Sequence, residues 1–200
     1  VPMLSIEDVF NEKDVAEWIE KVHFIHPGCG FSVETKIDGL SLSLRYEKNE
    51  QGILQLVLAE TRGNGFIGED VTANALVIPD VKRTIDLPYD FLELRGEIYM
   101  SHADFMKFNE EQESQMKKSA ANPRNLAAGT LRQLDTSVTR ERGLRMFIFN
   151  VQKGPQVLTE SHTKALDILS DCGIPVVYHK FCSSPDEVAG AIDDIGKMRE

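Results

Sequence analysis

Cysteine is scarce in this sequence. The three cysteines, Cys29, Cys172 and Cys182, are scattered, and none has a Cys or His partner at the spacing of zinc ligands. This excludes a zinc finger and a disulfide framework, and we expect free, partly buried thiols in a reducing cytosol. The five histidines also form no cluster, so the sequence leaves any metal ligands unknown.

Long apolar runs are missing as well. No segment approaches the roughly 18 to 20 apolar residues that a membrane-spanning helix needs. The first residues, Val1 to Leu4, do not form a basic segment followed by an apolar one, as an export signal would. We therefore expect a cytoplasmic protein that does not enter a membrane.

The chain carries a strong excess of acidic residues, but not uniformly. Its formal net charge of −10 argues against a protein that coats nucleic acid through bulk electrostatic attraction. Between Lys117 and Arg145, however, seven basic residues stand against two acidic ones. Such a segment is typical either of an ordinary solvated surface or of a local patch that faces a polyanion, and both interpretations stay open.

The order of predicted helices and strands indicates an α+β domain. Helical spacing and caps predict helices over residues 6–22, 69–76, from 101 onward and over 123–134. Alternation and branched residues predict strands over residues 31–37, 40–47, 53–61, 91–100 and 145–151. Asp38-Gly39 is a hairpin-turn signal between the first two strands. The tail predicts helix, strand (176–181) and helix, a small α/β lobe over residues 155–200 within a single domain.

The segment from Val33 to Gly39 is the most informative for chemistry. On a strand, alternate side chains share a face, so Glu34, Lys36 and Asp38 are predicted to point the same way. A lysine held between two carboxylates can be positioned as an amine nucleophile. The alternative is an ion-paired strand without chemistry, and this segment alone does not decide between them.

A second charged face is predicted on the strand over residues 91–100, where Glu93, Arg95 and Glu97 share one side. Gly96 is a poor strand former, which often marks the close approach of a ligand or another backbone. In the glycine-rich stretch over residues 61–70, Arg62 offers a fork suited to a phosphate or a ribose oxygen. This stretch is not a P-loop, because no Gly-Lys-Ser/Thr follows. An amphipathic edge strand and an ordinary loop are the alternatives.

Two arginines share the predicted helix over residues 123–134. Arg124 and Arg132 are eight positions apart, a little over two helical turns, so both fall near one face. Arginines arranged in this way can grip successive phosphates, and a solvated helix explains them equally well.

Taken together and in this order, these segments resemble the NAD⁺-dependent DNA ligases of bacteria over essentially the whole chain. Lys36-Ile37-Asp38-Gly39 is similar to the lysine-x-aspartate-glycine motif of covalent nucleotidyltransferases. The loop over residues 61–72 and the block over residues 122–135 are more specific, since they separate this family from ATP-dependent ligases and capping enzymes. The resemblance implies a nucleotidyltransferase (ATP-grasp-like) fold with mixed or antiparallel sheets flanked by helices.

The resemblance also implies roles for single residues. Lys36 would carry AMP as a covalent AMP-lysine adduct, with Asp38 in the same catalytic motif. Arg124 and Arg132 match arginines that act on nicked DNA. The residues implied to bind the nucleotide are Ser5, Ile6, Glu34, Lys36, Arg62, Glu97 and Phe149. Phe149 stands where the family commonly has a tyrosine that stacks on adenine, and Asn64 replaces the aspartate usual in the glycine-rich loop.

The implied activity is nick sealing in DNA replication and repair, with NAD⁺ as the AMP donor, Mg²⁺ at the phosphates, and nicked double-stranded DNA as the partner of a monomer. The family's preceding helical domain, further catalytic lysines and a zinc-binding module are expected outside these 200 residues. We therefore expect this stretch alone to lack full activity. A non-catalytic nucleotide- or DNA-binding module and an ATP- or GTP-using nucleotidyltransferase remain as alternatives.

Overall fold

The computed structural model describes residues 8, 9, 11–63 and 67–198 and divides the chain into two compact units. The larger unit contains residues 37–177, and the smaller unit contains the described parts of residues 4–36 and 178–200. The stretch over residues 155–200, which the sequence predicts as one lobe, is thus shared between the units. Across the described ranges, no helix is both long and apolar enough to cross a bilayer.

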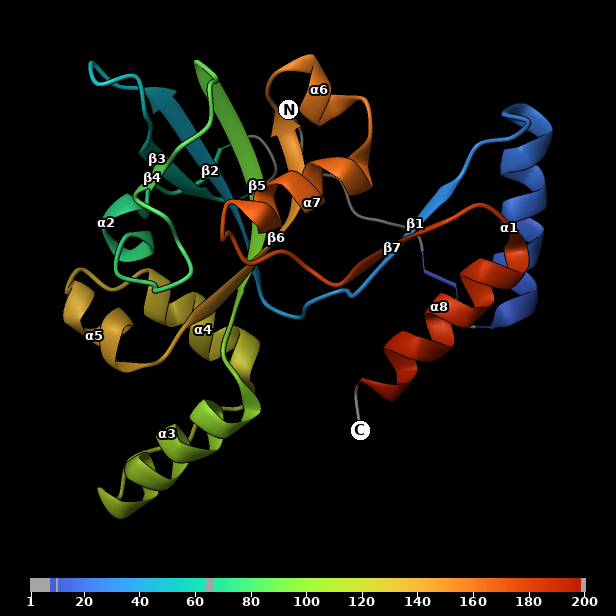
Figure 1. Ribbon diagram of the computed structural model, residues 1–200. Helices are drawn as coiled ribbons and strands as arrows, with labels where there is room; N and C mark the ends of the chain where they lie inside the picture. The colour runs from blue at the N-terminus through green and yellow to red at the C-terminus, as the bar shows by residue number, and fades with distance from the viewer. Residues whose placement is uncertain (1–7, 10, 64–66, 199–200) are drawn as a thin grey trace. The chain divides into compact units, whose positions relative to one another are not determined.

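A five-stranded antiparallel sheet forms the centre of the larger unit (Figure 1). Its strands, in spatial order, are β4 (Thr84–Ile85), β3 (Leu54–Thr61), β2 (Leu40–Lys48), β5 (Phe91–Tyr99) and β6 (Arg145–Lys153). The predicted alternation of β2 is confirmed, because Leu42, Leu44 and Tyr46 are buried on one face. The Tyr46 hydroxyl donates to the Lys82 carbonyl oxygen at 2.8 Å, and burial raises the pKa of this phenol far above its usual value.

Both edges of this sheet are limited in what they expose. On one side, β4 has two residues. On the other side, the N–H of Ile148 in β6 donates to the Pro175 carbonyl at 2.8 Å, and the Ile148 carbonyl accepts from the N–H of Val177 at 2.9 Å. The chain after the last helix of this unit therefore continues the hydrogen-bond ladder at the middle of β6.

Helices complete the core of the larger unit. They are α2 (Thr72–Ala75), α3 (His102–Ser114), α4 (Pro123–Leu131), α5 (Thr136–Glu141), α6 (Gln156–Thr159) and α7 (His162–Asp171). Ala127 and Leu131 of α4 and Leu166 and Leu169 of α7 are fully buried in the same cluster as the sheet. In contrast, α3 buries no residue and projects from the unit (Figure 1). Its predicted cap is confirmed, since the Ser101 side chain accepts from the N–H of Asp104.

The smaller unit is a two-stranded antiparallel sheet with two helices. β1 (Phe31–Glu34) pairs with β7 (His179–Cys182), and α1 (Glu12–Ile25) and α8 (Pro185–Lys197) accompany them. Its own core consists of Ile19, Phe31, Cys182, Val188 and Ala191. The two units thus have separate hydrophobic cores.

The three thiols are free, as predicted. Cys182 is buried, and Cys29 and Cys172 are half-buried. Burial raises the pKa of Cys172 and of Cys182, which favours the unreactive protonated thiol at neutral pH.

Several predicted boundaries are wrong. The first helix begins at Glu12, because Asn11 caps it by accepting from the N–H of Asp14 at 2.9 Å, and it extends three residues beyond Val22. The helix that begins at Pro123 ends at Leu131. The final strand begins at His179 and not at residue 176.

The predicted hairpin at Asp38-Gly39 is also wrong. β1 ends at Glu34 and pairs with β7, whereas β2 pairs with β3 and β5. Gly39 serves close packing instead of a turn, since a Cβ atom there would lie 2.0 Å from the carbonyl oxygen of Ile98 in β5. Lys36 and Asp38 therefore lie beyond the end of β1, the strand that carries Glu34.

Candidate functional site

A charged face on the central sheet is the first part of the candidate site. The register pairs Ser41 with Glu97 and Ser43 with Arg95 across β2 and β5, so these side chains share one face. The Ser41 hydroxyl donates to the Glu97 carboxylate at 2.6 Å, and the Ser43 hydroxyl donates to Glu93 at 3.2 Å. Glu97 is buried. The structure thus holds a buried carboxylate in a fixed place, as a site that recognises hydroxyl groups requires.

Two arginines add positive charge to this face. Arg62 follows directly after β3, and Arg95 lies in β5 between Glu93 and Glu97. Burial lowers the pKa of the Arg95 guanidinium, Glu93 opposes this shift, and the nearby charge of Arg62 adds to it. Arg62 and Arg95 are far apart in the sequence, yet they lie close enough in the fold for their charges to interact.

Phe149 lies at a distortion of the sheet. The pairs Gly96–Ile148 and Arg95–Asn150 flank a register shift between β5 and β6, and Phe149 is the extra residue there. Its half-buried ring packs against the main core. A bulge re-aims the side chain that it carries and is common beside functional sites.

The segment from Lys36 to Gly39 joins the two units. Lys36 is the last residue of the smaller unit in this part of the chain, and Ile37 is the first of the larger unit. Lys36 and Asp38 are both exposed. Gly39 is buried, and a Cβ atom there would lie 3.2 Å from the Glu97 side chain. The motif therefore leads directly to the charged sheet face.

Glu34 lies in β1 of the smaller unit, where the Ser32 hydroxyl donates to its carboxylate at 2.5 Å. Two other predicted nucleotide-binding residues, Ser5 and Ile6, lie outside the described residues, as does Asn64.

Helix α4 carries the two arginines that were predicted to contact DNA. Asn122 caps this helix by accepting from the N–H of Asn125, and Pro123 occupies its first turn, a position that tolerates proline. Arg124 lies in the first turn and contacts Asp38 at 3.3 Å. Arg132 is the C-terminal cap and contacts Glu69 at 2.6 Å. Both guanidinium groups are exposed and rest on exposed carboxylates, which are the same kind of partner as a phosphate.

Two other arginines of the basic segment over residues 117–145 have partners within the larger unit. Arg145 makes two hydrogen bonds to Asp80, at 2.7 and 3.0 Å, and this contact raises the pKa of Arg145. Arg142 donates to the Thr130 hydroxyl at 2.7 Å and lies over the Phe108 ring. Arg142 is therefore half-buried, whereas Arg145 stays exposed although it is paired.

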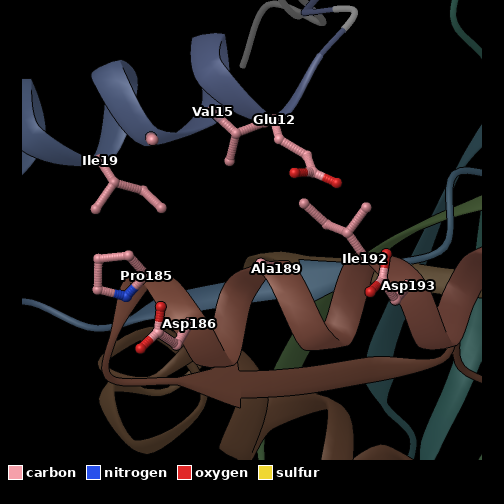
Figure 2. Close-up of a pocket in the computed structure, with 9 residues that line it drawn as sticks. Glu12, Val15, Ile19, Pro185, Asp186, Ala189, Ile192 and Asp193 are labelled. Carbon is pink, nitrogen blue, oxygen red and sulfur yellow. The ribbon is translucent and has the colours of Figure 1, made fainter.

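The smaller unit contains a groove between α1 and α8, with a volume of about 190 Å³ (Figure 2). Val15, Ile19 and Ile192 line it with apolar groups, and its carboxylates come from Glu12, Asp186 and Asp193. A groove of this composition disfavours a phosphate group, because like charges repel. Among the predicted site residues that the structure describes, none lines this groove.

Within the described parts of the chain, no three His, Cys, Asp or Glu side chains come together as a metal site. Mg²⁺ commonly binds one or two carboxylates together with substrate phosphates and water.

Sequence reasoning missed a buried polar network between α2, α4 and α5. Asn74, Thr130 and Thr139 are its buried members. Polar residues in short helices are ordinary on a surface, and the signal that identifies these three is their burial, which depends on contacts between distant parts of the chain.

The mixed α/β architecture, with antiparallel sheets and flanking helices, is compatible with a nucleotidyltransferase-type domain. The family model for the NAD-dependent DNA ligase adenylation domain matches residues 1–200. The chain belongs to this family.

Proteins similar to this chain are named DNA ligase. A protein named DNA ligase from Clostridium kluyveri is 43% identical over 200 residues, which cover 100% of this chain and 29% of the relative. DNA ligase from Cereibacter sphaeroides is 43% identical over 203 aligned positions, covering 100% of this chain and 28% of the relative. DNA ligase from Methylorubrum extorquens is 43% identical over 197 residues, which cover 94% of this chain and 24% of the relative. The chain therefore spans less than a third of the length of these relatives.

Proposed function

We propose that this chain is the adenylation core of an NAD⁺-dependent, nick-sealing DNA ligase with the nucleotidyltransferase (ATP-grasp-like) fold. It would act as a monomer in the cytoplasm, on nicks left by DNA replication and repair. The family match over the whole chain supports the reaction class. The arrangement of Lys36, the charged sheet face and α4 supports the assignment of single residues.

One observation carries the proposal: the exposed Lys36 lies only three residues before Gly39, which packs against the side chain of the buried Glu97. Fully extended, three residues span at most about 11 Å, so the backbone of Lys36 stays near the sheet face. The side chain adds further reach toward a nucleotide bound there.

The proposed reaction begins at the Lys36 Nζ atom. The neutral amine attacks the adenylyl phosphorus of NAD⁺, an N–P bond forms, the P–O bond to nicotinamide mononucleotide breaks, and the amine releases a proton. An oxygen of a DNA 5′-phosphate then attacks the AMP phosphorus and breaks the N–P bond, which frees the lysine. Finally the 3′-hydroxyl attacks the 5′-phosphorus and displaces AMP, which seals the nick.

The sheet face would hold the nucleotide during the first step. Glu97 would accept hydrogen bonds from ribose hydroxyls, and Arg62 would contact a phosphate or a ribose oxygen. Phe149 offers a ring for stacking on adenine. Glu34, Ser5 and Ile6 are assigned to the adenine by resemblance. Bound Mg²⁺ would offset negative charge on the phosphates.

Arg124 and Arg132 would contact phosphates around the nick. Each guanidinium is exposed and paired with an exposed carboxylate, and DNA phosphates can replace that partner. Asp38 links the catalytic motif to α4 through its contact with Arg124.

Labelling of the full-length protein tests the proposal. NAD⁺ labelled at the adenylyl phosphate should transfer label to the protein, whereas labelled ATP and GTP should not. Lys36→Ala should abolish the labelled band because it removes the amine. Lys36→Arg should abolish it as well, because a guanidinium stays protonated and cannot attack. Lys13→Ala is a matched control, since Lys13 makes only an exposed pair with Glu17, and it should be labelled normally.

Each alternative gives a different result. Labelling by ATP or GTP would identify another nucleotidyltransferase, and nucleotide binding without labelling would identify a binding module. A labelled band in either Lys36 variant would rule out this nucleophile.

A further inference from the structure

Asn74 in α2 makes hydrogen bonds that reach the end of α4. Its side-chain N–H donates to the Gln133 carbonyl oxygen at 2.7 Å, and its side-chain oxygen accepts from the Thr139 hydroxyl at 2.8 Å. Asn74 is 7% exposed, so water cannot readily replace these partners. Gln133 is the residue directly after Arg132, and Asn74 therefore fixes the backbone next to a proposed DNA-binding arginine.

The inner side of α4 is fixed by a second set of bonds. Thr130, which is fully buried, donates to the Leu126 carbonyl at 2.7 Å and accepts from the Arg142 guanidinium at 2.7 Å. Thr139 and Arg142 belong to α5 or follow it directly. Helices α4 and α5 are thus joined by side chains, and Asn74 attaches this pair to α2.

The segment that contains Asn74 also contains Glu69, the partner of Arg132. Residues 69–74 and 131–134 line a surface groove with a volume of about 660 Å³. Arg132 and Glu69 therefore both line this groove and contact each other at 2.6 Å. Glu69 pairs with the Arg132 guanidinium group, whereas Asn74 fixes the backbone next to Arg132.

We propose that Asn74 is a positioning residue for the DNA-dependent steps, which presents Arg132 to a nucleic-acid phosphate by holding the Gln133 carbonyl. This inference rests on the proposed function of Arg132 as a DNA contact. Asn74 does not touch the substrate and acts through Arg132. Its removal should therefore affect nick binding and sealing, and leave the transfer of AMP to Lys36 intact.

A double-mutant cycle on the full-length protein tests this dependence. The variants are Asn74→Ala, Arg132→Ala and the double variant, and the measurements are affinity for a nicked duplex, nick sealing, lysine adenylation and melting temperature. We expect Asn74→Ala alone to weaken nick binding roughly two- to tenfold, the effect of about one polar contact. In the Arg132→Ala background, the same change should cost less than about twofold, because residues that act as a unit are not additive.

Two further variants keep the test decisive. Thr139→Val removes the hydroxyl that donates to Asn74 and should also weaken nick binding. It replaces Asn74→Ala in the double-mutant cycle if that variant does not fold. Tyr46→Phe removes another buried hydroxyl that donates to a backbone carbonyl. It should lower the melting temperature without weakening nick binding.

The outcomes separate the two hypotheses. If Arg132→Ala leaves nick binding unchanged, the proposed role of Arg132 fails, and the role of Asn74 fails with it. If Arg132→Ala weakens binding but the losses multiply in the double variant, the positioning role alone is overturned. Loss of lysine adenylation in Asn74→Ala, in parallel with sealing, would also overturn it.

Discussion

The ion pair between Arg132 and Glu69 predicts a gain of function. At 2.6 Å the Glu69 carboxylate competes with any phosphate for the same guanidinium. Glu69→Gln keeps the size of the side chain and removes its charge. We therefore expect this variant to bind a nicked duplex more tightly than the unchanged protein does.

The size of the gain follows from the exposure of the pair. The Arg132 and Glu69 side chains are 52% and 58% exposed, and pairs of this kind contribute about 0.2 to 1 kcal/mol. Release of Arg132 should then tighten binding roughly 1.4- to 5-fold. The same loss should lower the melting temperature by no more than about 4 °C. The gain should shrink as salt is added, because exposed charges are screened.

Fluorescence anisotropy with a nicked duplex, at several salt concentrations, measures the effect. Asp90→Asn is the matched control, since it also removes one carboxylate from an exposed pair of the larger unit, at 2.8 Å from Lys48. Equal gains in both variants would show a bulk effect of net charge and refute competition at Arg132. Weaker binding by Glu69→Gln would show that Glu69 helps to present the arginine.

Four further substitutions have defined outcomes. Gly39→Ala should lower the free energy of unfolding by about 1 to 3 kcal/mol, because the new methyl group meets backbone at 2.0 Å; an unchanged urea midpoint would contradict the packing. Asp80→Ala should cost about 1 to 3 kcal/mol, since a carboxylate that is 9% exposed loses three hydrogen bonds. Asp90→Ala should cost less than about 1 kcal/mol, and equal melting temperatures would refute this ranking. Ser41→Ala removes the hydrogen bond that holds the Glu97 carboxylate and should raise the KM for NAD⁺ roughly two- to tenfold. An unchanged KM in steady-state labelling would argue against nucleotide binding by Glu97.

Local patterns predicted most of the central sheet. β2, β3 and β5 lie within one residue of the predicted ranges, and in β2 and β5 the alternation of apolar and polar residues favours a strand. The short elements were missed. β4 has two residues and α5 has six, which is too few for a period to be recognised. These elements exist through tertiary packing.

Partner choice between strands could not be predicted. β1 and β2 are neighbours in the sequence, yet β1 pairs with β7 from the other end of the chain. The Asp38-Gly39 signal favoured a local hairpin, and only the close packing of Gly39 on β5 shows why the chain continues without turning back. Long-range pairing depends on the whole core, which no local pattern encodes.

For the candidate site, charge patterns identified Glu93, Arg95 and Glu97 on one strand face, and the structure confirms that strand. Their hydrogen-bond partners Ser41 and Ser43 were not identified, because partners depend on the register between strands. Arg142 was counted with the polyanion-facing residues, although the structure half-buries it against Thr130 and the Phe108 ring. Sequence distinguishes the sign of a charge, and only packing distinguishes its availability.

The covered edge of β6 bears on how the larger unit behaves in concentrated solution. An unpaired strand edge is a template for another chain, and long exposed edges promote aggregation. Here Pro175 and Val177 already bond to Ile148 at the middle of β6, while the opposite edge strand, β4, offers two residues. Within the residues that the structure describes, the middle of β6 is therefore already paired, which shortens the edge that a strand of another copy could extend.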